Sequence, residues 1–195
     1  MPVIVKVEKV GRFCSVVLDN GERVLMLCRD AKRLEGEVDG NLLRREREVP
    51  LAKECAYRYL SIRDRTVAEM RRYLTGKGFS DATVKDVLDF LREVSLLDDK
   101  AFARKWVGSR GKDRGKRLLL VELSRLGVER DIIEEVLGEQ GDSEFDVALS
   151  IAEKRWKRMV DLPPEKKRRR LASFLLRRGF SWDVINNVLE RLSSE

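Results

Sequence analysis

The side chains of this sequence that are best suited to chemistry are basic, and they fall into two clusters. Against Asp113 alone, the segment 104–117 holds seven basic residues: Arg104, Lys105, Arg110, Lys112, Arg114, Lys116 and Arg117. Against Asp161 and Glu165, the segment 154–178 holds eleven: Lys154, Arg155, Lys157, Arg158, Lys166, Lys167, Arg168, Arg169, Arg170, Arg177 and Arg178. Such an excess suits phosphate groups or an acidic protein surface. The alternative is that these are ordinary solvated helix faces of a chain with 38% charged residues.

Residues that could support catalysis are scarce. The 195-residue chain contains no histidine, so the commonest general base and metal ligand is missing. The segment GSRGKDRGKR, 108–117, has Arg110 where a phosphate-binding loop requires its first glycine. The neighbouring carboxylates Asp98 and Asp99 are better explained as the start of a helix than as a metal site. We expect a protein that is not an enzyme and uses no cofactor or metal; an enzyme would need a metal site assembled from scattered carboxylates.

The three cysteines indicate a reducing compartment. Cys14, Cys28 and Cys55 are an odd number without CxxC spacing, so we expect small buried thiols and neither a disulfide nor a metal site. The segment MPVIVKVEKV interrupts its apolar residues with charges and does not resemble a signal peptide. No apolar run is long enough to span a membrane. We therefore expect a cytoplasmic protein with no membrane contact.

One sequence motif occurs three times and indicates the helices on which the basic clusters lie. LTGKGFSDATVKDVLDFL (74–91) and LLRRGFSWDVINNVLERL (175–192) both read as a helix end, a Gly-Phe break and a second helix, and LSRLGVERDIIEEVL (123–137) is a weaker copy. Gly78, Gly127 and Gly179 mark the breaks, 49 and 52 residues apart. A serine follows two of them as an N-cap, Ser80 and Ser181. A period near 50 residues predicts a repeat architecture.

The apolar residues predict three helices in each repeat. The helix after each glycine carries one stripe at helical spacing, consisting of Val84, Val87, Leu88 and Leu91, then Ile132, Ile133, Val136 and Leu137, then Ile185, Val188, Leu189 and Leu192. The helix before it repeats an inward pair, Met70/Leu74, Leu119/Leu123 and Leu171/Leu175, and the first of these opens with the capping box Thr66–Glu69. A further upstream helix carries Tyr57, Trp106 or Trp156.

We therefore expect a mainly α fold of three tandem three-helix repeats, at residues 50–95, 96–141 and 142–195, stacked into an elongated, curved solenoid. Trp106, Trp156 and Trp182 are interpreted as packing residues rather than stacking platforms for bases.

Residues 1–49 differ from the repeats and predict a small β region with a linker. There are two β-rich runs, VIVKVEKV (3–10) and RFCSVVLDNGERVLMLC (12–28), and the second contains DNGE, 19–22, an Asn-Gly turn of the hairpin kind. We expect two or three strands that lean on the first helices or pair with another strand, because an isolated hairpin is marginal in water. The stretch 33–50 reads as a loop and a short helix that ends at Pro50.

The repeat motifs resemble the RecX family, regulators of the bacterial RecA recombinase. The resemblance covers residues 50–192 and rests on RTVAEMRRYLTGKGF (65–79), LREVSLLDDKAFARKWVGSR (91–110), GKRLLLVELSRLGV (115–128) and LLRRGF (175–180). Ser95 departs from the family pattern, where glycine is common, and Leu126-Gly127-Val128 replaces a full KGF. The resemblance implies tandem three-helix repeats that lie in the helical groove of the RecA–DNA filament, limit its ATP hydrolysis and strand exchange, and so act in recombination, DNA repair and the SOS response.

The two basic clusters are the expected RecA- and DNA-contacting residues, with Arg104, Lys105, Arg114, Lys116, Arg168, Arg169 and Arg170 the first choices on charge alone. We expect a monomer with weak, sequence-independent affinity for single- or double-stranded DNA. Two other hypotheses stay open at this point. One is a sequence-independent DNA-binding protein that competes with RecA for single strands, and the other is a helical-repeat adaptor for an unrelated protein partner.

Overall fold

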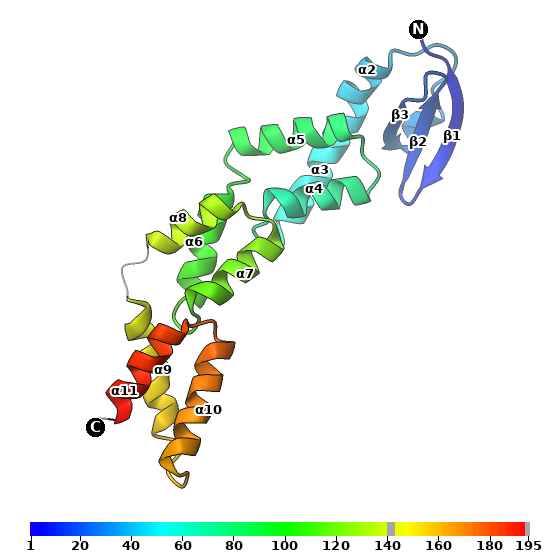
Figure 1. Cartoon of the computed structure of the whole chain (residues 1–195). Helices are drawn as coiled ribbons and strands as arrows, with labels where there is room; N and C mark the ends of the chain where they lie inside the picture. The colour runs from blue at the N-terminus through cyan, green and yellow to red at the C-terminus, as the bar shows by residue number, and fades with distance from the viewer. Residues whose placement is uncertain (140–142, 194–195) are drawn as a thin grey trace. The chain divides into compact units, whose positions relative to one another are not determined.

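The protein divides into two compact units that share one helical motif. The computed structural model describes residues 1–139 and 143–193, and the chain separates into Met1–Asp98 and Asp99–Glu195. The first unit contains a three-stranded sheet and one three-helix repeat, and the second contains two three-helix repeats (Figure 1). The predicted mainly α fold of tandem three-helix repeats behind a small β region is confirmed.

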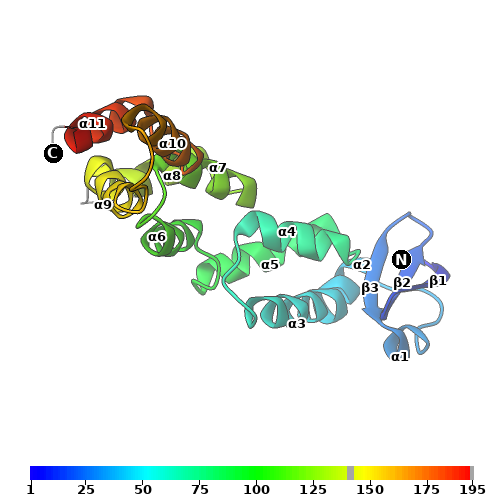
Figure 2. The same cartoon turned by 90° about the horizontal axis from the view of Figure 1, so that it is seen from below.

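Each repeat consists of three successive helices. The first repeat contains α3 (Val49–Leu60), α4 (Val67–Gly76) and α5 (Asp81–Glu93). The second contains α6 (Asp99–Arg110), α7 (Lys116–Leu126) and α8 (Arg130–Gly138). The third contains α9 (Glu144–Trp156), α10 (Pro164–Arg177) and α11 (Trp182–Ser193). Figure 2 shows the three helices of each repeat gathered around a common centre.

The helix boundaries follow the predicted signals. Gly78, Gly127 and Gly179 have φ angles of 92°, 86° and 85°, which a side chain at Cβ would oppose. The hydroxyl of Ser80 accepts a hydrogen bond from the backbone N–H of Thr83, so α5 starts where the sequence predicts. The capping box of Thr66 and Glu69 opens α4. Local residues therefore determine where these helices begin and end.

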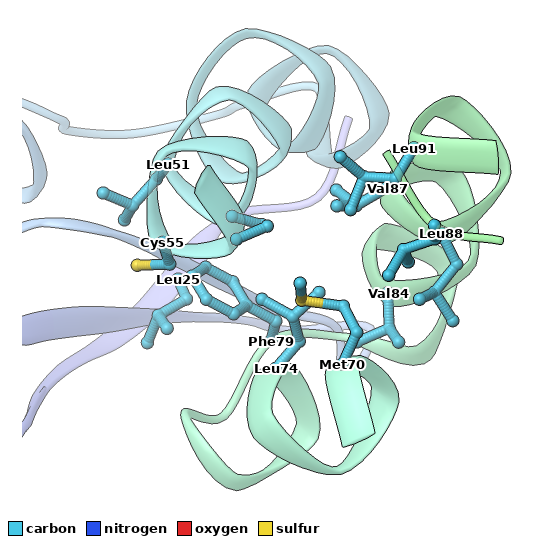
Figure 3. Packing of buried hydrophobic residues seen from close by; sticks show 13 residues of the cluster. Leu25, Leu51, Cys55, Met70, Leu74, Phe79, Val84, Val87, Leu88 and Leu91 are labelled. Carbon is cyan, nitrogen blue, oxygen red and sulfur yellow. The ribbon is translucent and has the colours of Figure 1, made fainter. Parts of the chain in front are cut away.

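Each repeat encloses its own hydrophobic core. In the first, Met70 and Leu74 of α4 meet the stripe of α5 and residues of α3, all nearly without solvent exposure (Figure 3). The equivalent pairs Leu119/Leu123 and Leu171/Leu175 are fully buried in the second and third repeats. Of the predicted stripe residues, only Ile132 is less than fully buried. Burial of these side chains at about 25 cal/mol per Å² is the main force that closes each repeat.

The N-terminal strands form an antiparallel sheet in the order of the sequence. The strands are β1 (Ile4–Val10), β2 (Phe13–Leu18) and β3 (Arg23–Leu27). The Asn-Gly turn joins β2 to β3, with Gly21 at φ 85° and the amide oxygen of Asn20 accepting the N–H of Glu22. The predicted hairpin is therefore present, extended by a third strand.

The sheet packs against helices on both faces. On one face Leu25 joins the core of the first repeat, near Phe79 (Figure 3). The ring centroid of Phe13 lies 6.0 Å from that of Phe79. On the other face Val24 and Met26 belong to a smaller cluster closed by the short helices α1 (Cys28–Ala31) and α2 (Gly40–Leu43). The expectation that the hairpin leans on the first helices is confirmed, and this second contact stabilises it further.

The expectation of three free thiols is wrong. Cys14 and Cys28 form a disulfide with their Cα atoms 4.8 Å apart, whereas Cys55 is a buried free thiol. Cys14 pairs with Met26 across the sheet, and Cys28 follows two residues later on the same face, so the two sulfurs become diagonal neighbours. Spacing along the chain could not reveal this pair, because strand register creates it.

The expectation that a short helix ends at Pro50 is also wrong. A π-helical turn, η1 (Arg44–Glu48), precedes α3, and Pro50 lies in the first turn of a helix that continues to Leu60. The N–H of Val49 bonds to the carbonyl of Arg44, five residues back. Proline lacks an N–H and crowds the carbonyl four residues before it, so a widened turn just upstream lets the chain pass through Pro50 while remaining helical.

One buried carboxylate links the sheet to the first repeat. Glu48, at the end of η1, has no solvent exposure. Its Oε1 accepts the N–H groups of Leu25 at 3.1 Å and Ser80 at 3.3 Å. Its Oε2 accepts the hydroxyls of Ser80 at 2.8 Å and Thr83 at 2.6 Å. The four donors come from β3 and from the start of α5, so Glu48 fixes three elements relative to one another.

Ser95 stands in a strained position between α5 and α6. Its φ is 55°, the one positive value for a residue other than glycine in the described part of the chain. The turn here returns the N–H groups of Leu96 and Leu97 to the carbonyl of Leu91 and buries Leu97 in the first core. Left-handed backbone costs a serine about 1 kcal/mol that glycine avoids.

We expect Glu48→Gln to lower the free energy of unfolding by about 2 to 4 kcal/mol, because an amide offers one acceptor oxygen to four buried donors. Urea denaturation followed by circular dichroism measures this. Glu46→Gln, at an exposed position two residues away, is the control and should change stability by less than about 0.5 kcal/mol. Equal effects from both substitutions would contradict the role assigned to Glu48.

We expect Ser95→Gly to raise the free energy of unfolding of the first unit by about 0.5 to 1 kcal/mol through relief of the left-handed strain. Ser61→Gly is the matched control, since Ser61 has a φ of −62° and its hydroxyl donates to the carbonyl of Arg58. That substitution should destabilise the protein. If Ser95→Gly were also destabilising in the same denaturant titration, the strain argument would be wrong.

Candidate functional site

The structure places both basic clusters at corresponding points of successive repeats in the second unit. The first cluster covers the end of α6, the following turn and the start of α7. The second covers the end of α9, the following turn and most of α10. Each cluster therefore joins the first and second helices of a repeat. The two clusters differ, however, in how much of their charge is neutralised within the protein.

Intramolecular pairs neutralise much of the first cluster. Arg104 makes two hydrogen bonds of 2.7 Å to the carboxylate of Glu139, and this pairing holds the pKa of Glu139 below its ordinary value. Arg114 pairs with Glu122, which also accepts the indole N–H of Trp106 at 3.0 Å. Two of the first choices made on charge alone therefore already have acidic partners inside the chain.

Of the remaining residues of the first cluster, some interact within the chain and others have no ion-pair partner among the described residues. The guanidinium of Arg110 lies 3.7 Å from the ring centroid of Trp106. Lys105 also interacts within the chain. Lys112, Lys116 and Arg117 are exposed, and their side chains have no ion-pair partner in the part of the chain that the structure describes. The first cluster thus contributes a few dispersed charges rather than a continuous surface.

The second cluster forms a recess, which we call the third-repeat recess. Its volume is about 490 Å³, and it is lined by Arg155 of α9 and by residues of α10: Lys166, Arg169, Arg170, Ser173 and Arg177. No acidic residue of the described chain lines it. Within residues 1–139 and 143–193, Lys166, Arg169, Arg170 and Arg177 have no ion-pair partner. Five basic side chains therefore converge on one site without internal neutralisation.

Helical spacing determines which residues of the run KKRRR, 166–170, line this recess. Lys166, Arg170, Ser173 and Arg177 are spaced by three or four residues and share one face of α10 with Arg169. Lys167 instead lies 5.6 Å from the ring centroid of Trp156, and Arg168 donates to the hydroxyl of Ser193 at 2.6 Å. Ser173 was missed in the sequence because only charge was considered, and the 3.6-residue period of the basic residues could have found it.

The other residues of the second cluster lie outside the recess. Lys154, Lys157 and Arg158 are exposed at the end of α9 and in the turn that follows. Arg178 pairs with Asp113, which also lies 3.7 Å from Arg114. The two clusters therefore adjoin at Asp113.

A close backbone contact supports this junction between the second and third repeats. The N–H of Gly115, before α7, donates to the carbonyl of Arg178 at 2.8 Å. A Cβ at Gly115 would press into the peptide group of Gly179, and a Cβ at Gly179 would press into Leu118. Glycine at both positions lets the start of α7 touch the turn between α10 and α11, and so sets α10 beside the middle repeat.

The tryptophans are only partly packing residues. Trp106 and Trp156 pack against the cores of the second and third repeats, as expected. Trp182 is 53% exposed at the first residue of α11, so its interpretation as a packing residue is wrong. Trp182 is the first residue of α11, directly after the Ser181 cap, so it lies at the helix end, outside the core that includes Ile185.

The described residues contain no cluster of three or more side chains that could hold a metal ion. Helix α6 begins at Asp99, as predicted from the LLDD segment. What the second unit offers chemically is therefore a set of fixed positive charges, suited to binding anionic groups.

Comparison with known proteins assigns the helical repeats. Family models for the first, second and third three-helix domains of RecX match residues 52–91, 98–137 and 142–189. The chain belongs to the RecX family. Relatives named Regulatory protein RecX include one from Mycobacterium sp. strain JLS, 39% identical over 151 residues, which span 72% of this chain and 82% of the relative. Another, from Mycolicibacterium smegmatis, is 37% identical over 145 residues, or 71% of this chain and 77% of the relative.

Solved RecX structures share the fold. The crystal structure of RecX from Lactobacillus salivarius superposes with a TM-score of 0.70 at 24% identity, covering 75% of this chain and 97% of that one. A second crystal structure of regulatory protein RecX superposes with a TM-score of 0.66 at 20% identity, covering 97% of this chain and all of that one. As for membranes, no helix in the described part of this RecX-family chain is long and apolar enough to cross one.

We expect Gly115→Ala to lower the free energy of unfolding of the second unit by about 1 to 3 kcal/mol, because a methyl group would force α7 away from the backbone of Gly179. Gly108→Ala is the control. Its Cβ would meet nothing, and it lies within α6, so it should stabilise the protein by about 0.5 to 1 kcal/mol. Thermal unfolding by calorimetry distinguishes the two signs, and a stabilising Gly115→Ala would contradict the close contact.

Proposed function

We propose that this protein binds the RecA–DNA filament, in its helical groove, and inhibits the ATPase and strand-exchange activities of RecA. It acts in this proposal by binding and not by catalysis. The observation that carries the proposal is the third-repeat recess, in which five basic side chains of a RecX-family chain face solvent without internal acidic partners. A filament of nucleoprotein presents phosphate groups and protein carboxylates, and both are ligands for clustered arginine.

The chemistry of the recess supports an anionic target. Arginine guanidinium groups pair with phosphate or carboxylate in a planar, two-bonded geometry that lysine cannot reproduce, and four of the five basic residues here are arginines. Since no neighbouring carboxylate must first be displaced, the charges keep their full attraction for a partner. The ion-paired Arg104 and Arg114 of the middle repeat would lose a partner on binding, so we assign them a smaller contribution.

Contacts from several repeats would add through multivalency. An exposed charge pair is worth at most about 1 kcal/mol, so a single substitution should have little effect. Several such contacts on one chain add because each further contact is intramolecular once the first has formed. Lys112, Lys116 and Arg117 of the middle repeat are additional exposed charges that could extend the contact.

A second candidate function uses the same recess. Clustered guanidinium groups bind the phosphates of bare single-stranded DNA as well as those of a filament, and the protein would then inhibit RecA by competing for DNA. This candidate predicts tight binding to bare DNA with a steep dependence on salt. The filament proposal requires only weak affinity for bare DNA.

We expect the triple variant Arg169→Glu, Arg170→Glu, Arg177→Glu to raise the protein concentration that half-inhibits the DNA-dependent ATPase of RecA by about tenfold or more. The measurement is ATPase rate against protein concentration at fixed salt, next to affinity for bare single-stranded DNA. Inhibition by the unmodified protein well below the concentration that coats bare DNA supports the filament as target. Inhibition only at coating concentrations supports the DNA competitor.

The control variant has the same change of charge elsewhere. Arg71→Glu, Arg72→Glu, Lys85→Glu alters three exposed residues of the first repeat that have no ion-pair partner among the described residues. It should leave the half-inhibitory concentration within about threefold of the unmodified value. If the recess variant inhibits as well as the control, with both folded by circular dichroism, the recess has no part in the function.

A further inference from the structure

A second recess lies in the first unit, far in sequence from the third-repeat recess. Its volume is about 660 Å³, within the range of small-molecule sites. The turn between β1 and β2 forms one wall, the chain from β3 into α1 forms another, and α3 and α4 form the rest. We call it the hairpin recess. It could not be predicted from the sequence, because its walls come from four separate segments that meet only when the sheet docks on the helices.

Four basic residues surround the hairpin recess: Arg12, Arg29, Arg58 and Lys77. The one carboxylate that lines it, Glu54, pairs with Arg58 on the same helix. Arg12 has no hydrogen-bond or ion-pair partner within the described residues. Lys77 extends over the ring of Tyr73, 4.9 Å from its centroid. Arg29 lies 3.8 Å from the carboxylate of Asp30. Arg12 and Lys77 therefore keep a positive charge without an acidic partner among the described residues, and with Arg29 at the rim they can attract an anion carrying several negative charges.

The floor of the hairpin recess is apolar. Leu51 and Cys55 are each 7% exposed at its base, and Phe13, Leu27 and Tyr73 are partly buried around them. Burial raises the pKa of the Cys55 thiol, so the sulfur stays uncharged and adds to the apolar surface. An inorganic anion would use only the charged rim, whereas a ligand that joins a flat apolar ring to phosphate groups would use rim and floor together.

The walls of this recess are fixed before any ligand binds. The Cys14–Cys28 disulfide holds the start of β2 against the start of α1, next to Phe13 and Leu27. Phe13 packs on Phe79, and the ring of Tyr73 stacks on that of Tyr59 with centroids 4.0 Å apart. A preformed site loses little conformational freedom on binding, which favours affinity for a small ligand.

We propose that the hairpin recess binds a nucleoside phosphate, with the phosphate groups on Arg12, Arg29 and Lys77 and the base against the apolar floor. The ligand is either a free nucleotide or one nucleotide of a single strand, since both present the same combination of base and phosphate. This site is independent of the proposed action on RecA, because none of its residues belongs to the basic clusters of the second unit.

Isothermal titration calorimetry of the full chain, without RecA, tests the site with four probes: ATP, adenosine, inorganic phosphate and a short oligothymidylate. We expect ATP, the oligonucleotide, or both to bind at least about tenfold more tightly than adenosine or phosphate, because only they occupy rim and floor. Tighter binding of ATP indicates a free nucleotide as the ligand. Tighter binding of the oligonucleotide indicates a strand, provided that it persists in the Arg169→Glu, Arg170→Glu, Arg177→Glu variant, in which the third-repeat recess cannot supply it.

The double variant Arg12→Ala, Lys77→Ala should weaken that binding by about tenfold or more, since both rim charges without an acidic partner are lost. Arg71→Ala, Arg72→Ala, which removes two exposed charges of α4 outside the recess, is the matched control and should leave it unchanged. Binding that survives the Arg12 and Lys77 substitutions, phosphate binding as tight as ATP binding, or no binding at millimolar concentration would each overturn the proposal. The Arg169, Arg170, Arg177 variant should bind nucleotide normally, which separates failure here from failure of the proposed function.

Discussion

The first unit depends on the hydrogen bonds of a single buried carboxylate. Removing Glu48 from water is costly, and the cost is offset only if both oxygens find donors, which here are two backbone N–H groups and two hydroxyls. Because those donors belong to β3 and to the start of α5, the sheet can dock in only one orientation without leaving the charge unsatisfied. The π turn before Pro50 brings Glu48 to this point. The hairpin recess exists because this orientation is fixed.

The second unit illustrates a different constraint, the distribution of charge between internal and external partners. The two basic clusters are both rich in arginine and lysine, but they differ in how much of their charge is paired within the chain. In the middle repeat, Glu122 and Glu139 pair with arginines and neutralise their charge. Helix α10 instead presents three arginines and one lysine along one face, and no carboxylate of the described residues lines the recess they form. Composition alone therefore overestimates the first cluster as a binding surface. The positions of a few glutamates on neighbouring helices decide which basic residues remain free for a partner.

Features with a local cause were predictable from the sequence, and features with a distant cause were not. The glycines at 78, 127 and 179, the capping box of Thr66 and the apolar stripes act within one or two helical turns, so their pattern is readable directly. The Cys14–Cys28 disulfide and the contacts of Glu48 join residues 14 to 35 positions apart, and the pairing of Arg178 with Asp113 spans 65. Such partners depend on strand register and helix docking. The third-repeat recess is intermediate, because helical spacing within α10 already contains most of it.

The meeting of Gly115 with Gly179 has a consequence for how such repeats can be recombined. The contact is between main-chain segments, so it does not depend on the chemistry of the surrounding side chains. It does require a hydrogen atom in place of a side chain at two positions that are 64 residues apart. A third repeat taken from a relative would therefore fit onto this middle repeat only if both turns keep their glycines. Repeats of this chain can therefore be exchanged only when the turns at their contact match. The segment to exchange is a repeat together with the turn that it contacts.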